Sequence, residues 1–253
     1  AAVHVVIIGF AQFDSTNKRI FEYENIKSNA HEKSAKNINA YLVEGDDIVI
    51  EKRRKPLCNV LNIIKGNYYA KSEGLIIEEK DLDYLVKNEP NAKKWIKLLI
   101  GADEFINNRK RYCLWLVDCP PDELRKMPLV MERVNRVRED RLKSTDKGMQ
   151  NLAPIRFRET NNPDKCIVIP VVSSEKRPYI PIGFIDKNTI STNGNLIIPN
   201  GDLFLFGQLT SLMHMSWVKY TCGRLESRFR YSKDLVYNNY PFPKNVSEKQ
   251  KKA

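Results

Sequence analysis

Residues 166–200 restrict the fold more than any other part of the chain. They hold three short runs rich in β-branched and aromatic residues: 166–174 (CIVIPVVSS), 179–185 (YIPIGFI) and 195–200 (NLIIPN). Proline, glycine and asparagine separate these runs, a pattern typical of short strands joined by turns. Together with the helical patterns on both sides, the runs predict a small, irregular α+β body.

Two further helices and a strand are expected before this region. Residues 78–87 and 91–99 have helical patterns and are separated by Pro90, which cannot continue a helix. Residues 112–118 (YCLWLVD) read as a strand because of their aromatic and branched content.

Residues 128–143 form the clearest helix in the sequence. Proline suits its first turn, and its apolar residues recur at helical spacing: Val130, Val134 and Val137. Arg138 and Arg141 fall close to the same side, so we expect the last turns to leave the core. These arginines have two possible roles, complementing the helix C-terminus or contacting phosphate.

A final helix is expected over residues 209–222. Its larger side chains fall on one side: Met213, Trp217 and Tyr220. Gly223 then suits a helix C-cap. His214 lies in this apolar helix, where we interpret it as a packed, hydrogen-bonded histidine rather than a general base.

The first part of the chain reads as strands. Residues 3–10 (VHVVIIGF) are nearly all β-branched, as in a strand covered on both faces, while residues 19–24 and 47–52 alternate in character. A buried strand so close to the first residue favours a piece of a longer protein. The basic segment 52–56 (KRRKP) predicts a module boundary.

Charge and cysteine content narrow the function. The formal net charge is +11, from 42 basic and 31 acidic residues, which favours a polyanionic partner. No apolar run is long enough to cross a bilayer, so no membrane partner is expected. The five cysteines include no CxxC pair, which favours reduced thiols in the cytoplasm over disulfides or zinc.

Catalytic motifs are not found in the sequence. It contains none of the patterns GxxxxGK, GxGxxG, GxSxG or HExxH, and we expect no catalytic, cofactor-binding or metal-ligating residue.

Basic side chains instead gather beside aromatic ones at two places. Lys176 and Arg177 lie in a turn between two expected strands, and a second group follows Gly223: Arg224, Arg228, Arg230, Tyr231 and Lys233. Guanidinium groups match phosphates and guanine edges, while aromatic rings stack on bases. The same residues also fit solvated charges over an aromatic core, and composition leaves both interpretations open.

Four long motifs give this pattern a family: EFINNRKRYCLWL, ELRKMPLVMERVNRVREDRLKS, IPVVSSEKRPYIPIGF and LTSLMHMSWVKYTCGRLESRFRYSKDLVYNNYPFP. In this order they resemble the region after the catalytic domain in the MmeI-like family of restriction-modification DNA methyltransferases. The resemblance implies the sequence-recognition part of a site-specific, adenine-specific enzyme. Such proteins use S-adenosylmethionine and often carry an N-terminal nuclease.

The resemblance also implies an organisation. Residues 1–55 are expected to hold the last strands of a methyltransferase sheet, residues 56–205 a mixed target-recognition domain, and residues 206–253 a C-terminal helical region. The family's methyl-donor glycine motif and its catalytic Asp/Asn-Pro-Pro-Tyr/Phe motif are not found in these residues. We therefore expect no methyl transfer by this chain alone and no bound cofactor in it.

The expected partners are double-stranded DNA and an upstream methyltransferase domain of the same protein. Phosphates are assigned to Arg224, Arg228, Arg230 and Lys233, with Arg138 and Arg141 as further candidates. Base edges are assigned to Lys176, Arg177, Asn193 and Asn195, because arginine suits guanine and asparagine suits adenine. The alternative is a non-catalytic basic module that binds RNA or an acidic protein.

Overall fold

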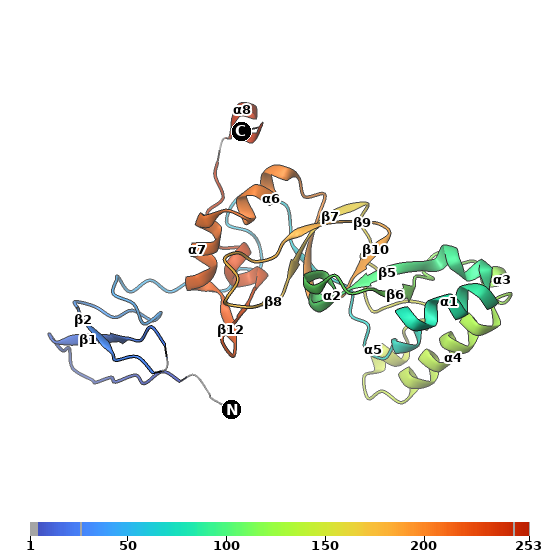
Figure 1. The fold of residues 1–253 in the computed structure, drawn as a ribbon, viewed down its shortest axis with the longest axis horizontal. Coiled ribbons are helices and arrows are strands. Elements are labelled where there is room, and N and C mark those ends of the chain that lie inside the picture. The colour runs from blue at the N-terminus through green and yellow to red at the C-terminus, as the bar shows by residue number, and fades with distance from the viewer. Residues whose placement is uncertain (1–4, 26, 245, 253) are drawn as a thin grey trace. The chain divides into compact units, whose positions relative to one another are not determined.

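The computed structural model describes residues 5–25, 27–244 and 246–252 (Figure 1). The chain divides into two compact units, residues 1–53 and 54–253, and each is considered by itself. Helices and strands alternate irregularly along the chain, so the α+β fold class expected from the sequence is confirmed.

The first unit is a small antiparallel hairpin with long connections. Strand β1 (Lys18–Glu22) pairs with β2 (His31–Ala35), with Lys18 opposite Ala35 and Glu22 opposite His31. The strand expected over residues 19–24 is therefore confirmed in β1. Ala35 is the one buried apolar residue among the described part of this unit.

Two other strands expected in this unit are not formed. In the first, residues 3 and 4 lie outside the described part of the chain, and residues 5–10 form an extended, exposed segment, with 96% of Ile7 and 95% of Phe10 accessible. Residues 47–52 also lack strand pairing. Branched residues favour strands only where a neighbouring strand supplies hydrogen bonds, and neither segment has one here.

The described residues of the second unit form three sheets. One has the order β10-β5-β6-β4 and is built from β4 (Ile76–Glu78), β5 (Ile96–Ile100), β6 (Arg111–Leu114) and β10 (Thr189–Ser191). Strand β10 runs parallel to β5, and the other pairs are antiparallel. The helices between residues 73 and 150 are η1 (Glu73–Leu75), α1 (Glu79–Asn88), η2 (Pro90–Trp95), α2 (Ala102–Asn107), α3 (Pro121–Leu124), α4 (Pro128–Leu142) and α5 (Lys147–Gln150).

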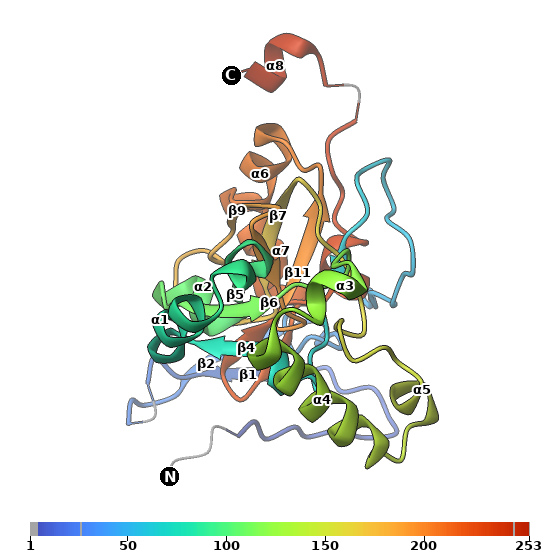
Figure 2. The ribbon, with the colours of Figure 1, turned by 90° about the vertical axis from the view of Figure 1, so that its right-hand side faces the viewer.

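The second sheet is entirely antiparallel, in the order β3-β11-β7-β9. Its strands are β3 (Ile64–Lys65), β7 (Lys165–Pro170), β9 (Gly183–Asp186) and β11 (Asn195–Pro199). Helices α6 (Leu203–Leu209) and α7 (Leu212–Thr221) lie beside it (Figure 2), and Leu205, Leu209 and Val218 share its apolar core. The π-helix η3 (Lys233–Tyr237) and the short helix α8 (Glu248–Lys252) follow.

The third sheet joins distant parts of the chain. Strand β13 (Arg228–Arg230) lies between β12 (Gly223–Leu225) and β8 (Val172–Ser173), antiparallel to both. The β12–β13 hairpin is therefore joined directly to the region of residues 166–200, which contains β8.

Most elements expected in the second unit are confirmed. The strands over 166–174, 179–185 and 195–200 correspond to β7 with β8, β9 and β11, and that over 112–118 to β6. The helices over 78–87 and 128–143 are α1 and α4. The final helix, expected over residues 209–222, is α7, which begins later because Leu209 ends the separate helix α6.

Two local expectations are wrong. Residues 91–99 form a 3-10 turn and then strand β5, because residues 96–100 pair with β6 on one side and with β10 on the other. Gly223 does not cap α7. The helix ends at Thr221, its C-cap Cys222 has extended backbone, and Gly223 is the first residue of β12.

No helix in the described residues is long and apolar enough to cross a membrane.

Candidate nucleic-acid interface

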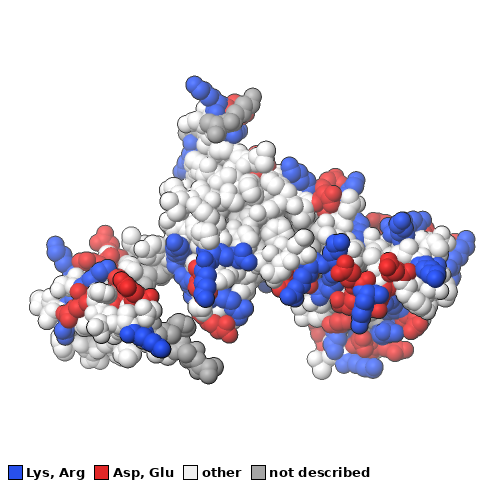
Figure 3. Space-filling model, in the orientation of Figure 1, with Lys and Arg blue, Asp and Glu red and all other residues white. Residues whose placement is uncertain are grey.

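Within strand β13, alternation places the aromatic side chain on one face and the two arginines on the other. Leu225 lies opposite Arg228, and Glu226 turns the chain with a left-handed backbone (φ 57°). Because successive side chains of a strand point to opposite faces, Phe229 enters the core, with 3% of its surface accessible, while Arg228 and Arg230 stay exposed. Lys and Arg side chains gather over this hairpin and the adjacent end of α7 (Figure 3).

The turn after β8 is brought beside this hairpin by strand pairing. Strand β13 pairs with β8 so that Arg230 lies opposite Val172 and Phe229 opposite Ser173. The following turn is closed by Ser174, whose carbonyl accepts from the Arg177 N–H at 3.2 Å. Lys176, within the turn, and Arg177, which closes it, are both exposed.

Glu175 joins the turn to the hairpin electrostatically. Its pKa lies below the ordinary value, mainly because its own backbone N–H stabilises the carboxylate, with added contributions from the Ser227 hydroxyl and the positive charge of Arg224. Groups of both basic segments therefore stabilise the charged carboxylate, Lys176 in the turn and Arg224 in the hairpin. It limits their mutual repulsion while leaving the surface positive.

Arg224 is held in place before any ligand binds. Its guanidinium donates to the carbonyls of Ser227 at 3.3 Å and Lys219 at 3.2 Å, and its central carbon lies 4.1 Å from the centroid of the Phe229 ring. Arg228 pairs with Glu226 at 2.9 Å. The hairpin thus presents one ordered guanidinium, one that forms an exposed ion pair with a neighbouring carboxylate, and the exposed Arg230.

The segment after β13 folds back on the body. Ser232 caps η3 through its hydroxyl, which accepts from the Leu235 N–H at 3.4 Å. Tyr237, Tyr240 and Phe242 are buried in the core of the second sheet. Lys233 lies at the start of η3 and is half-buried.

Tyr231 does not belong to the exposed surface. It is buried, and its hydroxyl lies 3.0 Å from Nε2 of His214. Burial lowers the pKa of His214 to about 4. The interpretation of His214 as a packed, hydrogen-bonded histidine is confirmed, whereas stacking of Tyr231 on a base is excluded in this structure.

Arg141 is also inside the protein, with 1% of its surface accessible. Its guanidinium donates to neutral acceptors: the carbonyls of Lys71, Leu152, Ala153 and Arg156 and the hydroxyl of Ser72. The expectation that this turn of α4 leaves the core is therefore wrong, because Arg141 satisfies main-chain acceptors of two loops and has no surface for phosphate. Arg138 is exposed and donates to Asn135 at 3.0 Å.

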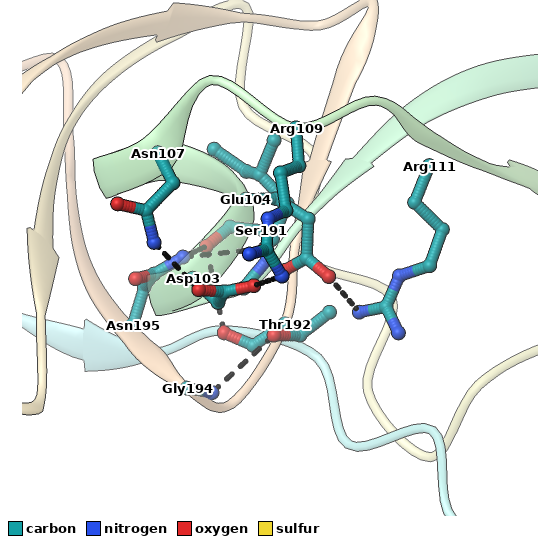
Figure 4. A network of polar contacts seen from close by, with 11 residues as sticks. Asp103, Glu104, Asn107, Arg109, Arg111, Ser191, Thr192, Gly194 and Asn195 are labelled. Atoms are coloured by element: carbon teal, nitrogen blue, oxygen red, sulfur yellow. Dashed lines mark hydrogen bonds and ion pairs between the residues drawn. The ribbon is translucent and has the colours of Figure 1, made fainter. Parts of the chain in front are cut away.

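The two candidate asparagines support a turn between sheets. Asn195 is buried and donates from its amide to the carbonyl of Ile100 at 3.2 Å and to the Ser191 hydroxyl at 3.3 Å, beside α2 (Figure 4). It cannot read a base from this position. Asn193 is half-buried, and its backbone N–H donates to the Asn67 carbonyl at 2.9 Å.

Sequence reasoning missed residues that shape the surface without being basic. Glu175 and Glu226 set the charge around Arg224 and Arg228, and the Lys219 carbonyl fixes Arg224. The spacing of Glu226 and Arg228, two residues apart across a tight turn, was the available signal.

The described residues offer neither a metal cluster nor an activated thiol. Across the described residues, no group of three His, Cys, Asp or Glu side chains lies close enough to hold a metal ion. All five cysteines are free, and burial raises the thiol pKa of four of them: Cys113, Cys119, Cys166 and Cys222. These four thiols are therefore unsuited to nucleophilic chemistry at neutral pH.

Comparison with known proteins identifies the family of this chain. The family model described as "MmeI, target recognition domain" matches residues 44–244. The "DNA methyltransferase A" of Bacillus subtilis (strain 168) is 38% identical over 247 residues, which are 96% of this chain and 27% of that protein. The solved structure of the type IIL restriction-modification enzyme MmeI in complex with DNA matches with a TM-score of 0.89 and 41% identity, over 95% of this chain and 32% of that one.

The chain thus spans less than a third of the length of either relative. The family model nevertheless covers most of the chain, and the resemblance expected from the four motifs is confirmed. The chain belongs to the MmeI target recognition domain family.

Proposed function

We propose that this chain is the DNA-recognition part of a site-specific adenine methyltransferase of a restriction-modification system. It holds duplex DNA in register while an upstream domain of the longer, cytoplasmic protein transfers the methyl group from S-adenosylmethionine. The supporting observation is the pairing of β13 with β8, which places the turn of Lys176 and Arg177 beside the hairpin of Arg224 and Arg230.

Holding the duplex is a physical requirement of the reaction. An adenine inside a duplex must leave the base stack before its amino group can be methylated, at a cost of a few kcal/mol. Contacts to the flanking phosphates fix the position and orientation of the protein, whereas contacts to base edges select the sequence. The two basic segments divide these tasks.

Phosphate contact is assigned to the hairpin and the start of η3. Arg224, Arg228, Arg230 and Lys233 supply four cationic groups on one continuous segment. With four phosphates neutralised, the logarithm of the affinity for duplex DNA falls against the logarithm of salt with a slope of roughly −4. A salt-independent affinity would exclude this assignment.

Base reading is assigned to the turn after β8. Arg177 is exposed, and its backbone N–H closes the turn by donating to the Ser174 carbonyl, so the guanidinium is attached to a hydrogen-bonded residue. Asn193 is kept as a secondary candidate because its side chain is half-buried, not enclosed. A bidentate arginine contact distinguishes guanine from the other bases by about 1 to 3 kcal/mol.

Selection from a randomised duplex pool tests the proposal and supplies the target sequence. Wild-type protein is expected to enrich one sequence, and Arg177→Gln is expected to lose about 1 to 3 kcal/mol at a single base pair of it. Lys87→Gln, an exposed change on α1, serves as the control with unchanged preference. An equal loss on every sequence would make Arg177 a phosphate contact, and no enrichment by the wild type would refute sequence recognition.

A further inference from the structure

Residues 57–61, at the start of the second unit, are attached to residues 237–242, which are called the C-terminal motif below. The backbone N–H of Leu57 donates to the carbonyl of Asn238 at 2.7 Å. The hydroxyl of Tyr237 donates to the carbonyl of Leu61 at 2.6 Å. Both contacts join the start of the unit to residues about 180 positions later in the sequence.

The attachment points are rigid. Tyr237 has 0% and Asn238 2% of their surfaces accessible, and both lie in or next to η3. The thiol of Cys58 adds a contact to the Phe242 carbonyl at 3.6 Å. Residues 57–61 are therefore a fixed strap across the C-terminal motif and not a loose linker.

Two basic residues stand directly before this strap. Arg54 and Lys55 are exposed, and Pro56 separates them from Leu57. Proline restricts the residue before it to extended backbone, so the backbone of Lys55 has little conformational freedom beside the strap. Two residues span at most about 7 Å, which keeps Lys55 close to the anchored Leu57.

The strap leads to the proposed phosphate contacts by a short path. The N–H of Asn238 donates to the carbonyl of Lys233 at 2.8 Å, so the residue that anchors Leu57 also contacts the start of η3. Lys233 follows the hairpin of Arg228 and Arg230 after two residues. Two hydrogen bonds and a few residues thus connect Lys55 to the hairpin over which basic side chains gather (Figure 3).

We propose that Arg54 and Lys55 are two additional contacts to the DNA backbone, held in place by the 57–61 strap. This inference rests on the proposed function and extends the DNA footprint beyond the hairpin. Residues on a flexible linker would lose conformational entropy on binding, whereas residues next to an anchored strap lose less and contribute more affinity. As contacts to phosphate alone, they add affinity without sequence preference.

The test compares two double variants of the complete chain by titration with duplex DNA over a range of salt concentrations. Arg54→Gln with Lys55→Gln removes the two proposed contacts. Lys80→Gln with Lys87→Gln removes two exposed positive charges from α1 and is the matched control. Each phosphate contact contributes about 0.9 to the slope of log affinity against log salt, so the first variant is expected to show a slope shallower by nearly 2.

Both variants are expected to keep the wild-type melting temperature and base preference. The control is expected to keep the wild-type slope as well. A wild-type slope for the Arg54 and Lys55 variant, or the same shallower slope in the control, would overturn the inference while DNA binding stood. Failure of the proposed function gives a different result, because the wild-type protein would then bind no duplex or bind it independently of salt.

Discussion

The guanidinium carbon of Arg224 lies 4.1 Å from the centroid of the Phe229 ring on the strand directly opposite. A cation over an aromatic face at this distance is attracted by the electron density of the ring. Phe229 belongs to the core, so its ring is an immobile support for an exposed charge. One residue thereby links the folding of the hairpin to the orientation of its proposed phosphate contact.

Replacing Phe229 with leucine separates these two roles. The variant is expected to lose about 1 to 2 kcal/mol of unfolding free energy, because leucine fills most of the space but not all of it. Its DNA affinity is expected to fall several-fold at every salt concentration, since Arg224 then has to be ordered on binding. The salt slope should not change, because no charge is lost.

Phe157→Leu provides the control for this experiment. Phe157 is equally buried but packs edge-on against Trp115 in the core of the other sheet. The same loss of stability with unchanged DNA affinity is expected. An equal loss of affinity in both variants would show that general destabilisation, not the Arg224 stack, weakens binding.

Arg141 is expected to be essential for stability. Its guanidinium satisfies acceptors from two loops, including the Lys71 carbonyl at 3.1 Å and the Ser72 hydroxyl at 2.6 Å. Arg141→Met leaves several buried acceptors without donors, each costing about 1 to 3 kcal/mol, so a loss of at least 3 kcal/mol is expected in urea unfolding. Arg138→Met, an exposed change on the same helix, should stay within about 0.5 kcal/mol of wild type. Equal effects would disprove the structural role.

Arg141 also shows where prediction from the sequence ends. Helical spacing correctly placed it near the apolar stripe of α4, but its acceptors are main-chain carbonyls, one of them 70 residues away. Nothing in the local sequence marks a carbonyl as needing a donor. The same limit applies to the β13–β8 pairing, which unites two basic segments that the sequence could only describe separately.

Local patterns were sufficient where neighbours agreed with them and failed where they did not. The branched runs of β7 and β11 became strands because each lies between two others in the sheet. The comparable run at residues 5–10 has no such partner and stays extended. Residues 96–100 fit a helix or a strand equally well by composition, and the parallel neighbour β10 decides for the strand.

His214 is expected to make stability depend on pH. Burial lowers its pKa in the folded protein to about 4, against 6.5 for an unperturbed histidine. Above pH 6.5 the His214 side chain is neutral in both the folded and the unfolded protein. As the pH falls below 6.5, His214 becomes protonated in the unfolded chain but stays neutral in the folded one. Stability therefore declines between pH 6.5 and pH 4, by about 3 kcal/mol at 1.4 kcal/mol per pKa unit.

Urea unfolding at several pH values checks this prediction. His214→Gln keeps a polar group facing the Tyr231 hydroxyl but cannot titrate, so its stability should fall less than that of the wild type over this range. Carboxylates with lowered pKa values, such as Glu123 and Glu175, lose their contribution in both proteins and cancel in the comparison. Parallel pH profiles for the two proteins would rule out a buried neutral His214.

Gly66 is expected to accept no side chain at all. It follows β3 and packs against the turn between β10 and β11, where its N–H donates to the Asn195 carbonyl at 3.1 Å. A Cβ atom at this position would lie 2.1 Å from the Thr192 carbonyl oxygen and 2.8 Å from that of Ser191. Both obstacles are backbone, so Gly66→Ala must displace the turn that joins the sheets and is expected to cost about 2 kcal/mol or more.

Gly207→Ala is the matched change at an open position. Gly207 lies in α6, and among the described residues no atom from outside its own stretch of helix lies within 4 Å of the place a Cβ would occupy. Alanine there favours the helix by about 0.5 to 1 kcal/mol. Opposite changes in melting temperature are therefore expected for the two variants.

Hydrogen exchange gives the finer measurement: Gly66→Ala should accelerate exchange in both β10 and β11, because the displaced turn is shared. Faster exchange in only one of them would show that the two sheets are held independently.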